Sequence, residues 1–325
     1  MPSRPINYAD ILAASARIAP HLDGSPVRHY PQLDTLVGHD IRVLVKHENH
    51  LPVNTFKVRN ATSALTALPA DVAARGVAAA STGNHGQGLA WAGARLDIPV
   101  TICVPVGNNP EKNAAIRSLG ARLVETGDSY DASAAACATI AAEEGLTVVH
   151  STNNRDVLAG AGTLTAEFLE QAPELDAIVI AVGGGSQAVG AIVVRDAIAP
   201  NLVVYGVQSI GARAQHDAWH DGRRRSGEIA NTFAEGIATG STYELTFDTL
   251  RSGLADFVLT TDSDMAQGVR DLLCITHNLV EGAGSAGLAG LHALAPRLAG
   301  QTVGIVLCGG NLDAARLMEI LAGRL

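Results

Sequence analysis

"AIVIAVGGGSQAVGAIVVRDAIA", residues 177–199, places an apolar run, a glycine-rich turn and a helix-like stretch in direct succession. The apolar run has the β-branched character of a strand that a parallel sheet buries on both faces. Similar runs recur along the chain with helix-like stretches between them, which predicts an α/β fold with parallel sheets. The other predicted strands are 100–105, 121–126, 147–150, 202–207 and 302–308, and the predicted helices are 85–96, 111–119, 131–145, 158–171, 188–199, 263–280 and 313–325.

Strand and helix alternate most tightly in residues 75–148. We expect this segment to form a small domain inserted into a larger one made of residues 1–74 and 149–325. Ligands of such folds bind beyond the carboxyl ends of the strands, so the loops that follow strands are the places to look for chemistry.

The net charge of −9 argues against a nucleic-acid partner, because phosphate binding needs a basic face. The one basic run, Arg223–Arg225, is short and is typical of a solvated loop. No apolar stretch approaches the length of about 18 residues that a membrane helix needs. Four cysteines without CxxC spacing suggest reduced thiols in a cytoplasmic protein. They are Cys103, Cys137, Cys274 and Cys308.

The turn "VGGGSQAVG", residues 182–190, can point several backbone N–H groups at one anion. It has neither the GxGxxG spacing of a dinucleotide site nor the lysine of a nucleotide-binding P-loop, so a single small phosphate fits best. A plain strand-to-helix turn is the alternative.

Two further loops have the same position after an apolar run. "STGNHGQG", residues 81–88, opens a helix whose free N–H groups attract a carboxylate or phosphate, although an ordinary capped helix start would look alike. "VLCGGNLDA", residues 306–314, puts Cys308 at a strand's carboxyl end, where a lone cysteine is more often a core residue.

"PVNTFKVRNA", residues 52–61, contains the most informative lysine. We expect Thr55 to cap a helix that begins near Phe56. Lys57 would then meet an unfavourable helix dipole, so helix stability does not explain it. Alone it could be a surface lysine. Together with a phosphate-binding turn and a polar helix start, it is what pyridoxal phosphate requires, because the cofactor's aldehyde forms a Schiff base with a lysine amine.

These motifs, with "VEGAGSAGLAG" at 280–290, occur in the order found in a known family. Over nearly its whole length the chain resembles the fold-type II pyridoxal-phosphate enzymes, which are tryptophan synthase β-like. The serine/threonine dehydratase and serine racemase group is most similar. The resemblance implies two parallel-sheet domains with pyridoxal 5'-phosphate between them, an amino-acid substrate, a homodimer and no nucleic-acid or membrane partner.

The resemblance also implies roles for individual residues. Lys57 would carry the Schiff base and later move the substrate's α-proton, and Thr82 stands where the racemase places a second catalytic hydroxyl. The other cofactor contacts would be Phe56, Asn84, Gly183, Gly184, Gly185, Ser186, Cys308 and Gly309. The substrate contacts would be Asn54, Ser81, Thr82, Gly83 and His85.

The implied reaction is elimination of water from a 3-hydroxy-amino acid, which gives a 2-keto acid and ammonia. Cys308 would face the pyridine nitrogen, and a thiol cannot hold that nitrogen protonated as a carboxylate would. This favours β-elimination over chemistry that needs a long-lived carbanion. An amino-acid racemase, a β-substituting synthase and a non-catalytic binding protein on the same fold are the alternatives.

Several positions depart from the family pattern. Asn54 and Asn60 stand where glycine is usual, and we expect Asn54 to alter substrate preference. Gln208 and Ala214 replace the acidic residues of the family's divalent-cation site, so we expect no strong metal site. No regulatory domain is expected after Leu325.

Overall fold

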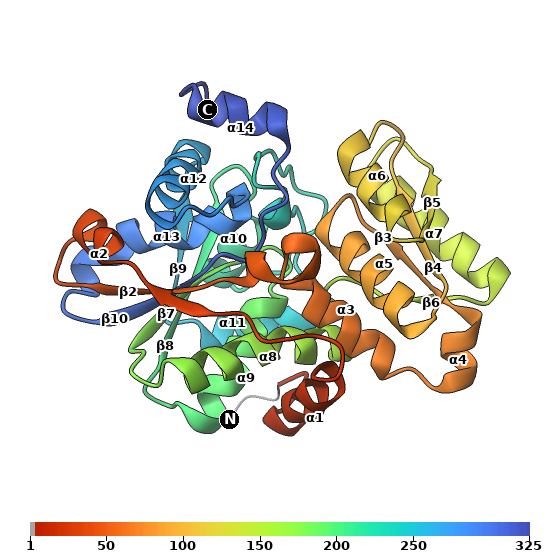
Figure 1. Cartoon of the computed structure of the whole chain (residues 1–325), viewed down its shortest axis with the longest axis horizontal. Helices are drawn as coiled ribbons and strands as arrows, with labels where there is room; N and C mark the ends of the chain where they lie inside the picture. Colours follow the sequence, from red (N-terminus) through yellow and green to blue (C-terminus); the bar gives the residue numbers. More distant parts are fainter. Residues whose placement is uncertain (1–3) are drawn as a thin grey trace.

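The computed structural model describes residues 4–325 and contains two sheets. Figure 1 shows the four-stranded sheet on one side of the molecule and the six-stranded sheet on the other. The α/β class with two parallel-sheet regions is confirmed. The six-stranded sheet has the order β1 (Val27–His29), β2 (Arg42–Lys46), β10 (Thr302–Val306), β7 (Ala177–Ala181), β8 (Val203–Ser209), β9 (Asp256–Thr260), and the four-stranded sheet has the order β5 (Arg122–Glu125), β4 (Val100–Val104), β3 (Val77–Ala80), β6 (Thr147–Val148).

All strand pairs are parallel except β1 with β2. Helices pack around both sheets. They are α1 (Tyr8–Ile18), α2 (Pro31–Val37), α3 (Lys57–Thr66), α4 (Ala70–Arg75), α5 (Asn84–Leu96), α6 (Pro110–Ser118), α7 (Tyr130–Glu144), α8 (Arg155–Gln171), α9 (Ser186–Ile198), α10 (Ala214–Asp221), α11 (Glu244–Gly253), α12 (Asp262–Thr276), α13 (Gly282–Leu294) and α14 (Ala314–Leu321), with short 3-10 turns η1 (Glu48–His50), η2 (Pro52–Asn54), η3 (Glu235–Ile237) and η4 (Ala295–Arg297).

Each of the six predicted strands overlaps an observed one, although β8 extends two residues beyond its prediction, and β1, β2, β3 and β9 were not predicted. β1 is only three residues long and lies at an edge, and β9 forms the opposite edge, so neither needs a continuous apolar run. β2 ends on Lys46, and a charged residue makes a buried strand difficult to predict from the sequence. The Lys46 ammonium is buried and contacts Glu167 at 2.5 Å.

The strands of the four-stranded sheet all lie between residues 77 and 148. The apolar core beside this sheet also takes side chains from outside that range, namely Ala61 and Leu65 of α3 and Val157 of α8. Helix α3 therefore bridges the two sheet regions, and the domain boundaries at 75 and 148 stay a prediction.

A sharp turn precedes α3. Val53 and Asn54 have φ angles of 54° and 53°, in the left-handed region that favours glycine and tolerates asparagine. This explains why asparagine can replace the usual glycine at position 54. α3 begins at Lys57 with Phe56, not Thr55, as its N-cap residue. The Thr55 hydroxyl still accepts from the Lys57 N–H at 3.4 Å, and it donates to the Cys308 carbonyl at 3.1 Å where the chain bridges to Gly309.

Buried ion pairs anchor α3 behind the turn. Arg59 donates from Nε to Glu48 at 2.8 Å and from Nη1 to Glu167 of α8 at 2.9 Å. Removing Arg59 would leave the buried Glu48 carboxylate without its ion-pair partner, so these contacts hold α3 in one position. Lys57, two residues earlier, is fixed with it.

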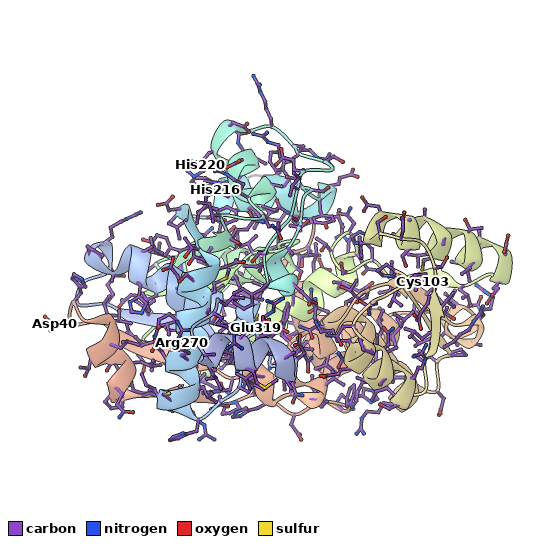
Figure 2. The ribbon with its side chains drawn as sticks, turned by 90° about the horizontal axis from the view of Figure 1, so that it is seen from above. Asp40, Cys103, His216, His220, Arg270 and Glu319 are labelled. Carbon is purple, nitrogen blue, oxygen red and sulfur yellow. The ribbon has the colours of Figure 1, made fainter. Side chains whose placement is uncertain are left out.

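The four cysteines are unpaired. Cys103, labelled in Figure 2, lies in β4 and packs with Cys137 of α7 in a separate apolar cluster. His216 and His220 of α10 lie on the other side of the same view, with ring centroids 4.4 Å apart. Among the described residues, no helix combines the length and apolar character needed to cross a membrane.

Candidate active site

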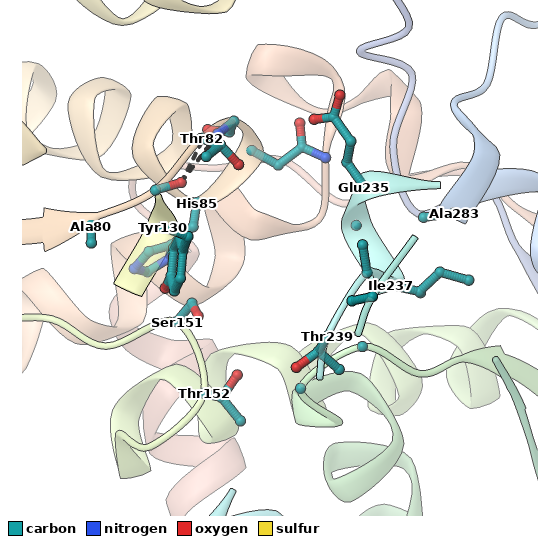
Figure 3. Close-up of a pocket in the computed structure, with 18 of the residues that line it drawn as sticks. Ala80, Thr82, His85, Tyr130, Ser151, Thr152, Glu235, Ile237, Thr239 and Ala283 are labelled. Atoms are coloured by element: carbon teal, nitrogen blue, oxygen red, sulfur yellow. Dashed lines mark hydrogen bonds between the residues drawn. The ribbon is translucent and has the colours of Figure 1, made fainter. Parts of the chain in front are cut away.

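A cavity of about 920 Å³ lies between the two sheet regions. Figure 3 shows Thr82, His85 and Tyr130 on one wall and Glu235, Ile237 and Thr239 on the opposite wall. The loops after β3, β7 and β10 meet here, as expected for the carboxyl ends of parallel strands. The predicted site residues that line the cavity are Phe56, Lys57, Ser81, Thr82, Gly83, Asn84, His85, Gly183, Gly184, Gly185, Ser186 and Cys308.

Lys57 faces this cavity from the first turn of α3. Its Nζ atom lies 4.8 Å from the centroid of the Phe56 ring. Burial lowers the pKa of Lys57 to about 8, although the neighbouring Cys308 and Glu281 oppose the shift. A lysine with such a pKa has far more free amine at neutral pH than an exposed one, so it can act as a nucleophile or base.

The glycine turn leaves space where side chains would collide. A β-carbon on Gly184 would lie 2.0 Å from the Thr152 hydroxyl oxygen, and one on Gly183 would lie 2.5 Å from the Gly236 carbonyl oxygen. Gly185 has a φ of 96°. Glycine is therefore required at all three positions, and the free N–H groups at the start of α9 stay open to an anion.

Two polar side chains beside this turn were not identified from the sequence. The Thr246 hydroxyl donates to the Gly184 carbonyl at 2.8 Å and fixes the turn. Gln187 lines the cavity, is 3% exposed, and its Nε2 makes no hydrogen bond with any described residue. Its position after a glycine run was the only signal available in the sequence.

Hydrogen bonds within the segment of residues 81–86 fix the conformation of this loop. The Ser81 hydroxyl oxygen accepts from the N–H groups of Gly86 at 2.9 Å and Gly83 at 3.3 Å. Ser81 therefore stabilises the start of α5, and Thr82 and Gly83 present the loop to the cavity. Direct contacts of these three residues with a substrate stay a prediction.

His85 is a buried residue of the first turn of α5. Its Nε2 lies 2.9 Å from the Val149 carbonyl oxygen, so Nε2 carries the proton. Burial lowers the pKa of His85 to about 3, so the ring is neutral. Its ring proton is used for Val149, which leaves the backbone N–H of His85 as its possible donor to a substrate carboxylate. The predicted contact stays a prediction.

Asn84 lies in a chain of three side chains. Its Nδ2 donates to Glu281 Oε1 at 2.7 Å, and its Oδ1 accepts from Asn311 Nδ2 at 2.7 Å. Asn54 and Gly309 are not among the described residues that line the cavity, and their predicted contacts with substrate and cofactor stay predictions. Asn54 is exposed and reaches only Asn311, at 3.4 Å.

Gly309 makes room for Glu281, because a β-carbon there would lie 2.6 Å from Glu281 Oε1. Its neighbour Cys308 lines the cavity and is 5% exposed. Burial raises the pKa of the Cys308 thiol, so the thiol stays protonated at neutral pH.

The cavity also carries charged and aromatic groups that were not predicted from the sequence. Lys112 of α6 is 12% exposed and forms an ion pair with Glu235 of η3. Among the described residues that line the cavity, Lys57 and Lys112 are the only lysines or arginines. Tyr130 and Tyr243 add aromatic surface to the cavity. No short motif marks these residues, because they come together only through the fold.

The residues at the family's divalent-cation site make other contacts here. Gln208 Oε1 accepts from the N–H of His216 at 3.0 Å, and Ala214 begins α10. In the described part of the chain, no group of three or more His, Cys, Asp or Glu side chains could hold a metal ion.

The fold and this site define an enzyme that uses pyridoxal phosphate: the chain belongs to the pyridoxal-phosphate-dependent enzyme family, which matches residues 18–309. It is 32% identical to an L-threo-3-hydroxyaspartate ammonia-lyase of Pseudomonas sp, over 98% of this chain and 99% of that protein. It is 30% identical to the L-threo-3-hydroxyaspartate ammonia-lyase of Saccharomyces cerevisiae, over 98% and 97%. Maize serine racemase has a similar structure, with a TM-score of 0.92, 25% identity and 98% of each chain covered.

The residues present fit the cofactor of this family. The glycine turn is a cradle that any β-carbon would fill, and it opens at the start of α9. Lys57 supplies the amine, and the buried thiol of Cys308 offers a neutral partner for a ring nitrogen. A phosphate site, an amine and a neutral polar partner on one cavity are the donor set that pyridoxal phosphate needs.

Proposed function

We propose that this protein is a pyridoxal-phosphate-dependent ammonia-lyase that eliminates water from a 3-hydroxy-amino acid and yields a 2-keto acid and ammonia. The observation that carries the proposal is Lys57, an amine with a pKa of about 8 that faces a cavity shared with a glycine-lined anion cradle. The bound cofactor supplies an electron sink that weakens the bonds at the substrate's α-carbon.

The protein would hold the cofactor at its phosphate, at its ring face and ring oxygen, and at its ring nitrogen. Gly183, Gly184, Gly185 and Ser186 would hold its phosphate with the N–H groups at the start of α9. Phe56 would flank the ring, and Asn84 would donate to the ring oxygen. Cys308 would face the ring nitrogen as a neutral thiol and leave that nitrogen uncharged, which suits elimination of a leaving group.

Proton movement falls to Lys57. Once a substrate amine has replaced it, its Nζ is free to take the proton from the α-carbon. The lowered pKa supports this role, because the free amine is then well populated near neutral pH. Substitution of Lys57 by alanine should abolish turnover.

We propose 3-hydroxyaspartate as the first substrate to test. Two relatives with this substrate in their names are at least 30% identical over nearly the whole chain. The α-carboxylate would bind the backbone N–H groups at the start of α5. Besides Lys57, Lys112 is the only lysine or arginine among the described residues that line the cavity. It would bind the second carboxylate of the substrate in place of Glu235.

Racemisation is the second candidate, since Thr82 places a hydroxyl on the same cavity and a serine racemase has a similar structure. The test is to follow each 3-hydroxy-amino acid for both keto acid and the opposite enantiomer. Keto acid in excess over the enantiomer supports the lyase. An enantiomer that forms without keto acid makes the protein a racemase, and a thioether product formed with added thiol makes it a β-substituting synthase.

We propose further that the protein is a homodimer in the cytoplasm, as family analogy and its reduced cysteines suggest. Sedimentation of the holoenzyme tests the first point: a single species of twice the chain mass of 33.5 kDa is expected. Cell fractionation tests the second.

A further inference from the structure

Glu281 occupies a position that the surrounding backbone is shaped to accept. It precedes α13 and lines the cavity. Two glycines leave room for its carboxylate: a β-carbon on Gly309 would lie 2.6 Å from Oε1, and one on Gly236 would lie 3.3 Å from the same atom. A side chain at position 309 would displace the carboxylate from its contact with Asn84.

The amide of Asn84 can take only one orientation in this setting. Its Nδ2 donates to Glu281, which as a carboxylate only accepts, and its Oδ1 accepts from the Asn311 amide nitrogen. Asn311 is itself fixed, because the same nitrogen donates to the Val53 carbonyl at 2.8 Å. Turning the Asn84 amide over would set oxygen against oxygen and nitrogen against nitrogen, and would lose both hydrogen bonds.

The Glu281 carboxylate contacts a neutral amide rather than a cation. Loss of water around it raises the pKa of Glu281 to about 7, and the charges of Lys112 and Lys57 oppose the shift. Desolvating a carboxylate in this way is unfavourable for folding by itself. Its presence at the cavity wall points to a role in the site.

We propose that Glu281 is a positioning residue that holds Asn84 as a hydrogen-bond donor toward the cofactor's ring oxygen. One Nδ2 hydrogen of Asn84 is taken by Glu281, which leaves the other for the ring. The inference rests on the cofactor named in the proposed function, and it holds equally for a lyase and for a racemase.

The test compares Glu281→Ala with Glu281→Gln in the purified holoenzyme, with Glu174→Gln as control. Glu174 is a surface carboxylate paired with Arg42. The readouts are the dissociation constant of pyridoxal 5'-phosphate and the visible absorption of the bound cofactor, so a failure of the lyase proposal leaves them unaffected. Glu281→Ala should weaken cofactor binding by at least about tenfold and shift the absorption band, because the hydrogen bond that orients the Asn84 amide is lost.

Glu281→Gln keeps an oxygen that accepts from Asn84, so it should stay within about threefold of the unaltered protein. Asn311→Ala loosens the same amide from its other end, and it should weaken binding and shift the band in the same direction. Unchanged affinity and absorption in Glu281→Ala would overturn the proposal, as would a Glu281→Gln protein as impaired as the alanine variant. If Glu281→Ala does not fold, unchanged cofactor binding in Asn311→Ala would overturn it.

Discussion

Lys112 and Glu235 form an ion pair across the mouth of the cavity. Lys112 belongs to α6 beside the four-stranded sheet, and Glu235 begins η3 beside the six-stranded sheet. A β-carbon on Gly83 would lie 4.0 Å from Lys112 Nζ, so the ammonium stands next to the loop expected to bind substrate. A substrate carboxylate and Glu235 therefore compete for one cation.

Replacing Lys112 by methionine should raise the KM of dicarboxylic substrates more than that of monocarboxylic ones. We expect the KM for 3-hydroxyaspartate to rise about 10- to 100-fold, the equivalent of one hydrogen bond to a charged group, while the KM for serine changes far less. Steady-state kinetics on both substrates measure this. Arg117→Met, an exposed position on the same helix, is the matched control. Equal changes for both substrates would contradict the role of Lys112.

The lowered pKa of Lys57 predicts how the rate of cofactor uptake depends on pH. Only the free amine attacks an aldehyde, and burial lowers the pKa of this lysine from its usual 10.5 to about 8. The rate at which apoprotein takes up pyridoxal 5'-phosphate should therefore rise about tenfold per pH unit below pH 8 and level off above it. Stopped-flow absorbance between pH 6.5 and 10 measures the profile. A rate that keeps rising to pH 10 would show an ordinary exposed lysine.

Gly184→Ala should damage the anion cradle. The new β-carbon would lie 2.0 Å from the Thr152 hydroxyl, so either the turn or Thr152 must move. We expect cofactor affinity to fall by about 100-fold or more, because the N–H groups no longer converge on the phosphate. A second change, Thr152→Ala, removes the nearest atom and should restore part of the affinity. Full affinity in Gly184→Ala alone would show that the cradle tolerates a side chain.

Asn60 should be a site where stability can be gained. It is fully buried in α3, and neither polar atom of its amide has a hydrogen-bond partner among the described residues. Asn60→Ala removes the unsatisfied groups and improves helix propensity, so the free energy of unfolding should rise by about 1 kcal/mol. Urea unfolding measures the change. A loss of more than about 1 kcal/mol would mean that the amide is satisfied and fills needed space.

Local motifs were enough to find part of the site. Lys57, Asn84 and the glycine turn each follow a strand or a marked turn, and the structure brings them to one cavity. The side chains that contact them could not be predicted from the sequence, because Glu281, for example, lies 197 positions from Asn84 along the chain. The left-handed φ of Asn54 could not be predicted from the sequence, and the expected effect of this residue on substrate preference stays a prediction.

The same limit applies to the fold. Strands with continuous apolar runs, such as β7 and β10, were predicted because both faces of a central strand are buried. The edge strands β1 and β9 carry polar residues, and their pairing depends on neighbours far along the chain. The predicted helix 313–325 ends earlier, at Leu321 in α14.

The most direct test of the central claim is the release of keto acid and ammonia from L-threo-3-hydroxyaspartate by the holoenzyme, with Lys57→Ala as control. Serine, threonine and the other stereoisomers complete the panel. The account predicts oxaloacetate and ammonia in equal amounts from at least 3-hydroxyaspartate, and none with Lys57→Ala. Release of no keto acid from any member, by protein that still shows the visible band of bound cofactor, would contradict it.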